Sequence, residues 1–196
     1  ARTAENGVDD TAAATQSVRD VVAPCGGRVI VADAASTGLP DGSADVVVGE
    51  AMLTMQNDKT KRAIVNEAYR VLRPGGRYAI HELGLTPDSV DTATKDEIRR
   101  ALARSIKVNA RPLTVAEWSE LLKASGFEVV STDRAPMALL NPRRVIADEG
   151  VLGALRLLKN VLLHGAARKR VLTMRRTFRE HRNALTAVAV VGVRPE

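Results

Sequence analysis

Apolar residues in this chain fall either into short continuous runs or into longer stretches with helical spacing, a pattern that predicts a sheet covered by helices. The runs over Arg28–Ala32 and Asp45–Gly49 are rich in valine, so they predict buried strands at the centre of a parallel sheet. Over Asp58–Leu72 the apolar residues recur three and four positions apart, which predicts a helix that Asp58 can cap. A third strand is expected over Arg77–Leu83, and strand, helix and strand with tight loops predict a right-handed crossover.

The rest of the chain predicts further helices and strands. The expected elements are helices over Thr11–Ala23, Asp91–Ile106 and Pro142–His181 and strands over Phe127–Thr132 and Leu185–Val193. Thr114 and Glu117 have the spacing of a capping box, which begins another helix that ends at Gly126. Because the sequence shows no repeat and no linker, we expect a single domain over residues 1–196, with a helical insertion over residues 135–183 before the last strand.

Composition and charge narrow the class of protein. The formal net charge is +6, and much of the basic excess lies between Arg168 and Arg182. A basic balance suits nucleic acid, anionic lipid or an acidic ligand, and it is also typical of a solvated helix face. The single cysteine, Cys25, excludes an internal disulfide. The longest apolar run is short and interrupted by charges, so we expect no transmembrane segment and a cytoplasmic protein.

Polar and charged residues follow the three strands that were predicted first. They are Asp33 and Ala34 after the first strand, Gly49, Glu50 and Ala51 after the second, and His81 and Glu82 at the end of the third. Ligands of open parallel sheets bind at the carboxyl ends of the strands, so these residues lie along one ligand-binding edge. An aspartate there can accept a hydrogen bond from an exocyclic amine while the next backbone N–H donates to a ring nitrogen, as adenine recognition requires. A turn cap by Asp33 is an equally good interpretation.

Acid–base chemistry is available at the same edge. Glu50, His81 and Glu82 are residue types that transfer protons in active sites, although a polar rim to a cleft is the other interpretation. Gly26-Gly27 precedes a strand rather than following one, so it predicts a turn and not a phosphate-binding loop. The sequence shows no metal-ligand cluster. The residues alone therefore predict a nucleotide-like ligand and do not define a reaction.

Three segments, in this order, carry a family resemblance. They are Val31-Ala32-Asp33-Ala34, Leu39-Pro40-Asp41-Gly42-Ser43-Ala44-Asp45-Val46-Val47 and Leu72-Arg73-Pro74-Gly75-Gly76-Arg77. Together they resemble class I S-adenosylmethionine-dependent methyltransferases, in the branch of small-molecule and quinone-biosynthesis-like enzymes. The resemblance implies an α/β fold, a Rossmann-like three-layer α/β/α arrangement with strand order 3-2-1-4-5-7-6 and an antiparallel last strand. On that scheme Arg28–Ala32 is the third strand.

The resemblance also implies a cofactor, a reaction and residue roles. The cofactor is S-adenosyl-L-methionine, and the reaction is methyl transfer to a small, partly apolar acceptor. Asp33 is expected to contact the adenine amino group, with the Ala34 N–H on the ring. The residues expected to flank the methionine part and the methyl group are Gly49, Glu50 and Ala51. The residues expected to supply any catalytic base are Glu82, His81 and Glu50.

The sequence departs from the family in one respect. The glycine-rich loop after the family's first strand, and the acidic residue that ends its second, have no counterpart among the 32 residues before Asp33. We therefore expect a sheet that lacks its first two strands, with a gap between the third and fourth strands and unpaired strand edges. We also expect the 196-residue chain by itself to bind the cofactor poorly.

A second function of a different class stays open. In that alternative the chain is a degenerate, non-catalytic binding domain whose basic helix, residues 166–182, holds RNA or an anionic membrane. The aromatic content is only 3%, which disfavours base stacking, so we expect no specific nucleic-acid partner. A small-molecule acceptor is the expected partner, and a homodimer is left open by the sequence.

Overall fold

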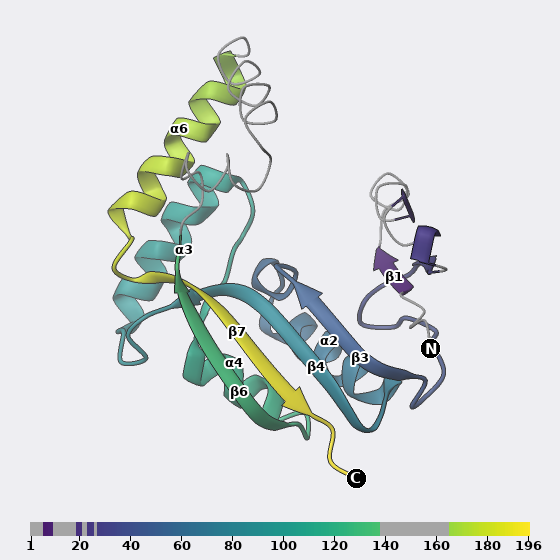
Figure 1. Ribbon diagram of the computed structural model, residues 1–196. Coiled ribbons are helices and arrows are strands. Elements are labelled where there is room, and N and C mark those ends of the chain that lie inside the picture. The colour runs from purple at the N-terminus through teal and green to yellow at the C-terminus, as the bar shows by residue number, and fades with distance from the viewer. Residues whose placement is uncertain (1–5, 10–18, 21–22, 26, 138–164) are drawn as a thin grey trace.

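The computed structural model describes residues 6–9, 19–20, 23–25, 27–137 and 165–196 (Figure 1). Most of the helix expected over Thr11–Ala23 lies outside the described residues, and so does the expected insertion from residue 138 to residue 164. Strand β6, Glu128–Pro136, is longer than its sequence prediction and reaches into the range expected for the insertion. Within the described residues, no helix is long and apolar enough to cross a membrane.

The main sheet has five strands and the topology that the family resemblance implies. Its central path is β3 (Ala44–Glu50), β4 (Leu72–Leu85), β7 (Leu185–Val193) and β6, and the short β5 (Leu113–Thr114) also pairs with β4. Strands β3 and β4 are parallel, whereas β7 is antiparallel to both of its neighbours. This order reproduces the 4-5-7-6 half of the expected sheet, so the predicted strand order and the antiparallel last strand are confirmed for these strands.

A second, two-stranded sheet lies apart from the main one. It pairs β1 (Asn6–Asp9) with β2 (Arg28–Val31) in parallel, and β2 is the strand expected to be the family's third. Strand β1 pairs with β2 as the family's second strand would pair with its third, and it ends at the acidic residue Asp9, so the expectation that both of the first two strands are lacking is wrong for one of them. Among the described residues, no strand lies between β2 and β3. Figure 1 shows the two β-structures separated at this point.

The prediction of fully buried strands is wrong for β2 and β3. Val31 and Val46 are each 57% exposed, and Val48 is 67% exposed. Successive side chains of a strand point to opposite faces. Val47 on the other face packs against the main core, because helices α2 (Asp58–Val71) and α4 (Val115–Lys123) lie on that side of the sheet (Figure 1). No described helix covers the face of β3 that carries Val46 and Val48.

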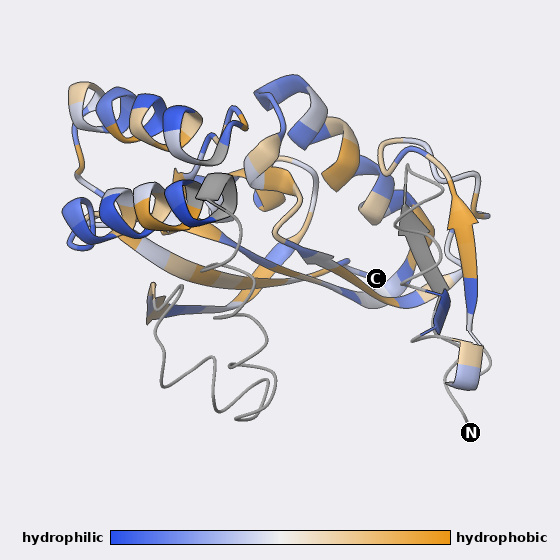
Figure 2. Ribbon diagram, turned by 90° about the horizontal axis from the view of Figure 1, so that it is seen from above, coloured by the Kyte–Doolittle hydropathy of each residue, from blue (hydrophilic) through white to orange (hydrophobic). Residues whose placement is uncertain are grey.

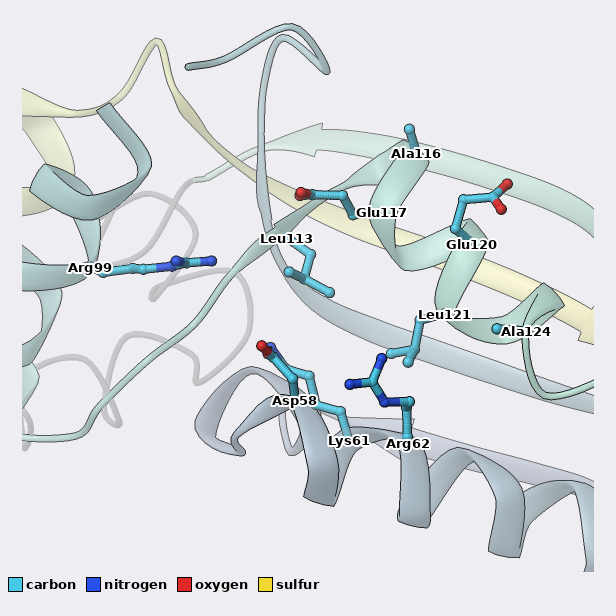
Figure 3. A pocket seen from close by; sticks show the side chains of 10 residues that line it. All are labelled: Asp58, Lys61, Arg62, Arg99, Leu113, Ala116, Glu117, Glu120, Leu121 and Ala124. Atoms are coloured by element: carbon cyan, nitrogen blue, oxygen red, sulfur yellow. The ribbon is translucent and has the colours of Figure 1, made fainter. Parts of the chain in front are cut away.

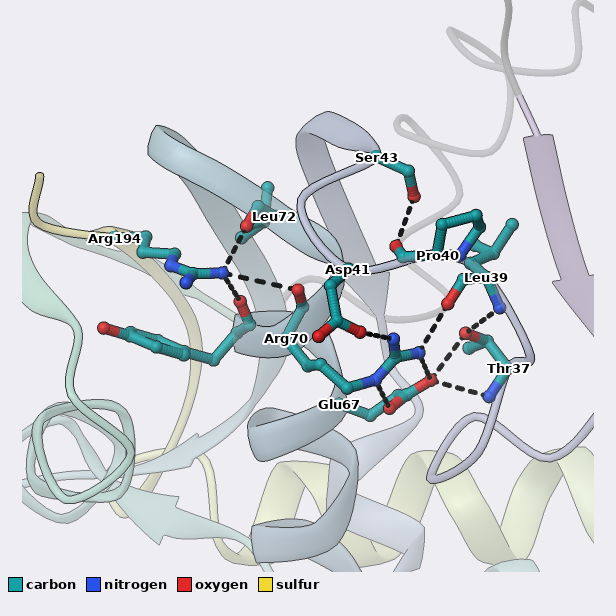
Figure 4. A network of polar contacts seen from close by, with 10 residues as sticks. Thr37, Leu39, Pro40, Asp41, Ser43, Glu67, Arg70, Leu72 and Arg194 are labelled. Carbon is teal, nitrogen blue, oxygen red and sulfur yellow. Dashed lines mark hydrogen bonds and ion pairs between the residues drawn. The ribbon is translucent and has the colours of Figure 1, made fainter.

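Helix α2 (Asp58–Val71) connects β3 to β4, as predicted. Its N-cap is Asn57, whose side-chain oxygen accepts a hydrogen bond from the Thr60 N–H at 3.0 Å, so the prediction that Asp58 is the cap is off by one residue. Arg194, the residue after β7, caps the C-terminal end of α2 (Figure 4). Its Nη1 donates to the carbonyls of Tyr69, Arg70 and Leu72 at 2.9, 3.3 and 2.6 Å, which satisfies helix-terminal acceptors.

A polar network fixes the turn between β2 and β3 onto α2 (Figure 4). Glu67 accepts hydrogen bonds from the Thr37 N–H and hydroxyl at 2.8 and 2.6 Å, and from Arg70. Arg70 also donates to the Leu39 carbonyl at 2.7 Å and to the Asp41 carboxylate. The hydrogen bonds from Arg70 are the main cause that lowers the pKa of Glu67 to about 2. The motif segment from Leu39 onward is therefore held in place by one acid and one arginine of α2.

Two apolar clusters form the core. The larger one joins α2, α4 (Val115–Lys123) and the sheet, and its most deeply buried members are Leu53, Val65, Leu72, Trp118, Leu122, Val188 and Val190. The smaller one joins α3 (Thr92–Ile106), α6 (Gly165–Glu180) and the ends of β4 and β7 through Ile98, Leu102, Leu85, Leu185 and Phe178. In Figure 2 the helices alternate between hydrophilic and hydrophobic residues, as amphipathic helices do. The capping box of Thr114 and Glu117 at the start of α4 is confirmed.

Candidate active site

The carboxyl ends of β3 and β4 bring two of the predicted site residues together. Glu50 ends β3 and lies opposite His81 in the register of the parallel pair. The Nδ1 atom of His81 is 2.7 Å from Oε1 of Glu50, and both side chains are more than half exposed. The Ala51 N–H donates to the His81 carbonyl at 2.8 Å, which ties the next residue to the same point. The structure therefore forms a carboxylate–imidazole pair, open to solvent, where the sequence predicted a ligand-binding edge.

The backbone after β3 turns sharply at this edge. Ala51 has φ +51°, a left-handed conformation that costs a non-glycine residue about 1–3 kcal/mol. The preceding residue, Gly49, has little room for a side chain, because a Cβ atom there would lie 3.2 Å from the Tyr78 hydroxyl oxygen. Tyr78 is itself buried, and burial raises the pKa of its hydroxyl. A glycine and a strained alanine thus direct the chain away from the sheet immediately around Glu50.

Glu82 follows His81 on β4 but faces the interior. Its side chain is 2% exposed, and both carboxylate oxygens are occupied. Oε1 accepts the N–H groups of Met52 and Leu53 at 3.0 and 2.7 Å, and Oε2 accepts the N–H and hydroxyl of Thr54 at 3.0 and 2.6 Å. Burial raises the pKa of Glu82, against the opposite effect of these donors. Glu82 therefore holds the short helix η2 (Leu53–Met55) in place beside the open edge.

Asp33 forms a tight turn after β2. Its Oδ1 accepts the Ala35 N–H at 2.8 Å, and its carbonyl accepts the Ser36 N–H at 2.8 Å. The turn-capping role weighed from the sequence is thus present through one carboxylate oxygen. Within the described residues, Oδ2 of Asp33 and the N–H of Ala34 have no hydrogen-bond partner, so an acceptor and a donor remain on adjacent residues. Ala34 and Ala35 pack against the larger core cluster, which connects this turn to the main sheet.

Some residues that shape the edge were not singled out from the sequence. Thr54 and Tyr78 belong to the support of the site, and neither carries a sequence signal beyond its residue type. The pair Glu67 and Arg70 does carry one, because acid and base three residues apart lie on one face of a helix. That spacing could have identified the anchor of the Leu39 turn.

Comparison with known proteins bears on the family and the fold of the chain. Residues 4–80 match a family model described as "Methyltransferase domain". The chain is 35% identical over 97 residues to a probable S-adenosylmethionine-dependent methyltransferase of Mycolicibacterium smegmatis, covering 48% of this chain and 32% of that protein. These matches support a class I S-adenosylmethionine-dependent methyltransferase. The family predicted from the three motif segments is thereby confirmed.

Two further similarities define how far this family relation extends. Over 159 residues the chain is 32% identical to an uncharacterized protein of Haemophilus influenzae, which covers 81% of this chain and 61% of that protein. The chain thus spans less than two thirds of the length of these two curated relatives. The crystal structure of MccD protein superimposes with a TM-score of 0.71 at 18% identity, over 98% of this chain and 80% of that one. At that identity the superposition shows a shared fold, and the α/β class predicted from the sequence is confirmed.

Proposed function

We propose that the protein methylates a small, partly apolar acceptor and that Asp33, Glu50 and His81 form the described part of its active site. The observation that carries the proposal is the Glu50–His81 pair at the open edge of a methyltransferase sheet, beside a turn with a strained backbone. S-adenosyl-L-methionine supplies an electrophilic methyl group when it is bound. Much of the rate of such a transfer comes from holding the acceptor in line with that group, so binding residues matter as much as proton transfer.

The residues of the turn after β2 fit the adenine side of this cofactor. An adenine offers an amino group that donates and a ring nitrogen that accepts. Asp33 keeps one oxygen free of described partners, and the adjacent Ala34 keeps its N–H, which is the complementary pair. We assign the adenine to these two residues. The end of β3, at Gly49, Glu50 and Ala51, is assigned to the methionine part, because the chain turns away there and leaves the Glu50 carboxylate exposed.

His81 is the residue best placed to accept a proton from the acceptor. When its Nδ1–H donates to Glu50, the lone pair lies on Nε2, and the side chain is exposed enough for an acceptor to reach it. Glu50 then orients the ring, and Glu82 holds the neighbouring η2 turn without facing the acceptor. Of the three residues proposed for acid–base chemistry, Glu82 is therefore assigned a positioning role.

Methyl-transfer kinetics of the full-length protein test this assignment. Replacing His81 by Gln removes the base while keeping a polar side chain, and we expect kcat to fall by about 100-fold, since a general base typically contributes 10²–10⁴-fold. The control is Glu128→Gln, an exposed acid at the opposite end of the sheet, which should leave kcat unchanged. Less than about a twofold loss for His81→Gln and for Glu50→Gln would remove acid–base catalysis from the proposal.

The alternative function, a binding domain that uses its basic helix, keeps one observation in its favour. Arg168, Arg175, Arg179 and Arg182 are exposed on or just beyond α6, while Val171, Met174 and Phe178 are half-buried, as the helical spacing predicts. A steep decrease of nucleic-acid affinity with salt would favour this alternative. The sequence matches favour the methyltransferase, and we propose the basic helix as a solvated face.

A further inference from the structure

A groove of about 560 Å³ lies in the helix layer between α2 and α4, closed at one end by Arg99 of α3 (Figure 3). The described residues that line it include none of the residues assigned to the active site. Lys61 and Arg62 reach it from α2, and Leu113 and Leu121 form an apolar wall on the side of β5 and α4. The groove is therefore a concave surface separate from the residues assigned to the active site.

Three cations face this groove, and one of them is buried. Lys61 is 1% exposed, its Nζ donates to the Arg111 carbonyl at 2.6 Å, and the same atom lies 5.2 Å from the centre of the Trp118 ring. Burial is the main cause that lowers the pKa of Lys61 to about 8, and the nearby charge of Arg99 acts in the same direction. The charge of Arg99 therefore adds to the cost of charging Lys61.

The two arginines have donors without acceptors. The Nε of Arg99 is buried and has no hydrogen-bond partner, although Nη1 reaches Asp96 at 3.3 Å. A buried donor left unpaired costs about 1–3 kcal/mol, so a shift of the Arg99 side chain that brings this N–H to an acceptor in the groove is stabilising. Arg62 has no hydrogen-bond or ion-pair partner within the described part of the chain. Both guanidinium groups therefore have unused capacity at the groove.

Two of the three acids that line the groove are paired with residues outside it, and the third, Asp58, is paired with Lys61. Glu117 pairs with Lys95 at 2.7 Å and closes the capping box of α4, and Glu120 pairs with Lys123 at 2.9 Å. Asp58 is exposed and stays 3.9 Å from Lys61. Arg62 and Arg99 are therefore the cations of the lining that have no ion pair with one of its acids among the described contacts.

We propose that this groove binds a small organic carboxylate, with the carboxylate on Arg62 and Arg99 and a short aliphatic tail on Leu113 and Leu121. A guanidinium presents two parallel N–H groups that match the two oxygens of a carboxylate. The buried ammonium of Lys61 adds positive potential behind them. The site is separate from the active site and does not depend on the proposed function.

Calorimetric titration with hexanoate tests the site. We expect saturable binding of hexanoate, no binding of hexylamine, and weaker binding of inorganic phosphate, which has no tail. Arg62→Gln/Arg99→Gln should lower the affinity for hexanoate about tenfold or more, since hydrogen bonds to charged groups contribute about 1.5–3 kcal/mol. Arg100→Gln is the matched control, because Arg100 is the exposed neighbour on α3 that does not line the groove and should leave the affinity unchanged.

Several other results would contradict the proposed carboxylate site. Equal binding of hexylamine would show that the ligand is held by apolar contact alone. Phosphate binding as tight as that of hexanoate would show that Leu113 and Leu121 contribute nothing to the affinity. An affinity for hexanoate that is unchanged in the double variant, or lowered equally by Arg100→Gln, would place the ligand elsewhere. Because Arg62 is exposed, Arg62→Gln alone should fold, and it must weaken hexanoate binding by itself.

Discussion

His81 and Glu82 are consecutive residues that face opposite sides of β4. His81 points to the open edge and meets Glu50, whereas Glu82 points into the interior and accepts four hydrogen bonds from the segment Met52–Thr54. The difference arises because successive side chains of a strand point to opposite faces of the sheet. The sequence shows that two titratable residues end this strand, but it does not show which of them faces the ligand, because that depends on the register of β4 against the core.

The buried carboxylate of Glu82 gives a prediction about stability. In Glu82→Gln one acceptor oxygen becomes an NH₂ group that faces backbone or hydroxyl donors, so at least one donor loses its partner. We expect the free energy of unfolding to fall by about 1–3 kcal/mol. Urea denaturation measures the loss, and Glu97→Gln, an exposed acid on α3, serves as the control. Equal stabilities of wild type and Glu82→Gln would contradict the role of Glu82 in holding the segment Met52–Thr54.

The pair of Glu67 and Arg70 gives a prediction about pH. The pKa of Glu67 is lowered from its ordinary 4.5 to about 2, mainly by its hydrogen bonds with Arg70. A lowered pKa contributes stability that is complete above the unfolded value and is lost as the pH falls toward the folded one. Wild type should therefore exceed Glu67→Gln by about 2 kcal/mol at pH 7, and the difference should shrink between about pH 4.5 and pH 2.

Thermal unfolding at a series of pH values measures this difference. Asp45→Asn is the control, because Asp45 pairs with Arg73 at 2.5 Å on the surface, where both side chains are more than half exposed. Surface pairs typically contribute about 0–1 kcal/mol, so this variant should show little change with pH. A constant difference between wild type and Glu67→Gln down to pH 2 would contradict the assignment.

The positions of the strands and helices along the chain can be predicted from local sequence patterns. How deeply each strand is buried cannot be predicted in this way. Valine-rich runs placed β2 and β3 correctly, but Val46 and Val48 are exposed, because burial of a strand depends on what covers its faces. The sequence of a strand does not show whether a helix covers each of its faces. Helix α2 was likewise located correctly, while its cap was assigned to Asp58 in place of Asn57, since both residue types cap helices equally well.

The cap of α2 can be tested by comparing these two neighbours. Asn57→Ala removes the acceptor of the Thr60 N–H, so we expect a loss of about 1 kcal/mol in the free energy of unfolding. Asp58→Ala removes a charge in the first turn, which should cost less, about 0.3–0.5 kcal/mol. Chemical denaturation of both variants distinguishes them, and a larger loss for Asp58→Ala would restore the sequence-based cap.

At the scale of the molecule, the family and half of the sheet could be predicted from three short segments. The order β3-β4-β7-β6 follows from the resemblance. Strand β1, which pairs with β2 and ends at Asp9, was not predicted, because Val8 is the one apolar side chain among its four residues. The groove at Lys61, Arg62 and Arg99 could not be predicted in this way. Its residues come from separate helices, and only the packing of α2, α3 and α4 brings them to one surface.

The central claim is that the turn after β2 forms the adenine side of a methyltransferase cofactor site. Calorimetry of the full-length protein with S-adenosyl-L-methionine, comparing wild type with Asp33→Asn, tests it most directly. Asp133→Asn is the matched control, because Asp133 is also exposed and also accepts the N–H of a nearby residue through Oδ1. The account predicts about tenfold weaker binding for Asp33→Asn, as loss of a charged hydrogen bond implies, and unchanged binding for Asp133→Asn. Binding by Asp33→Asn as tight as that of wild type would contradict it.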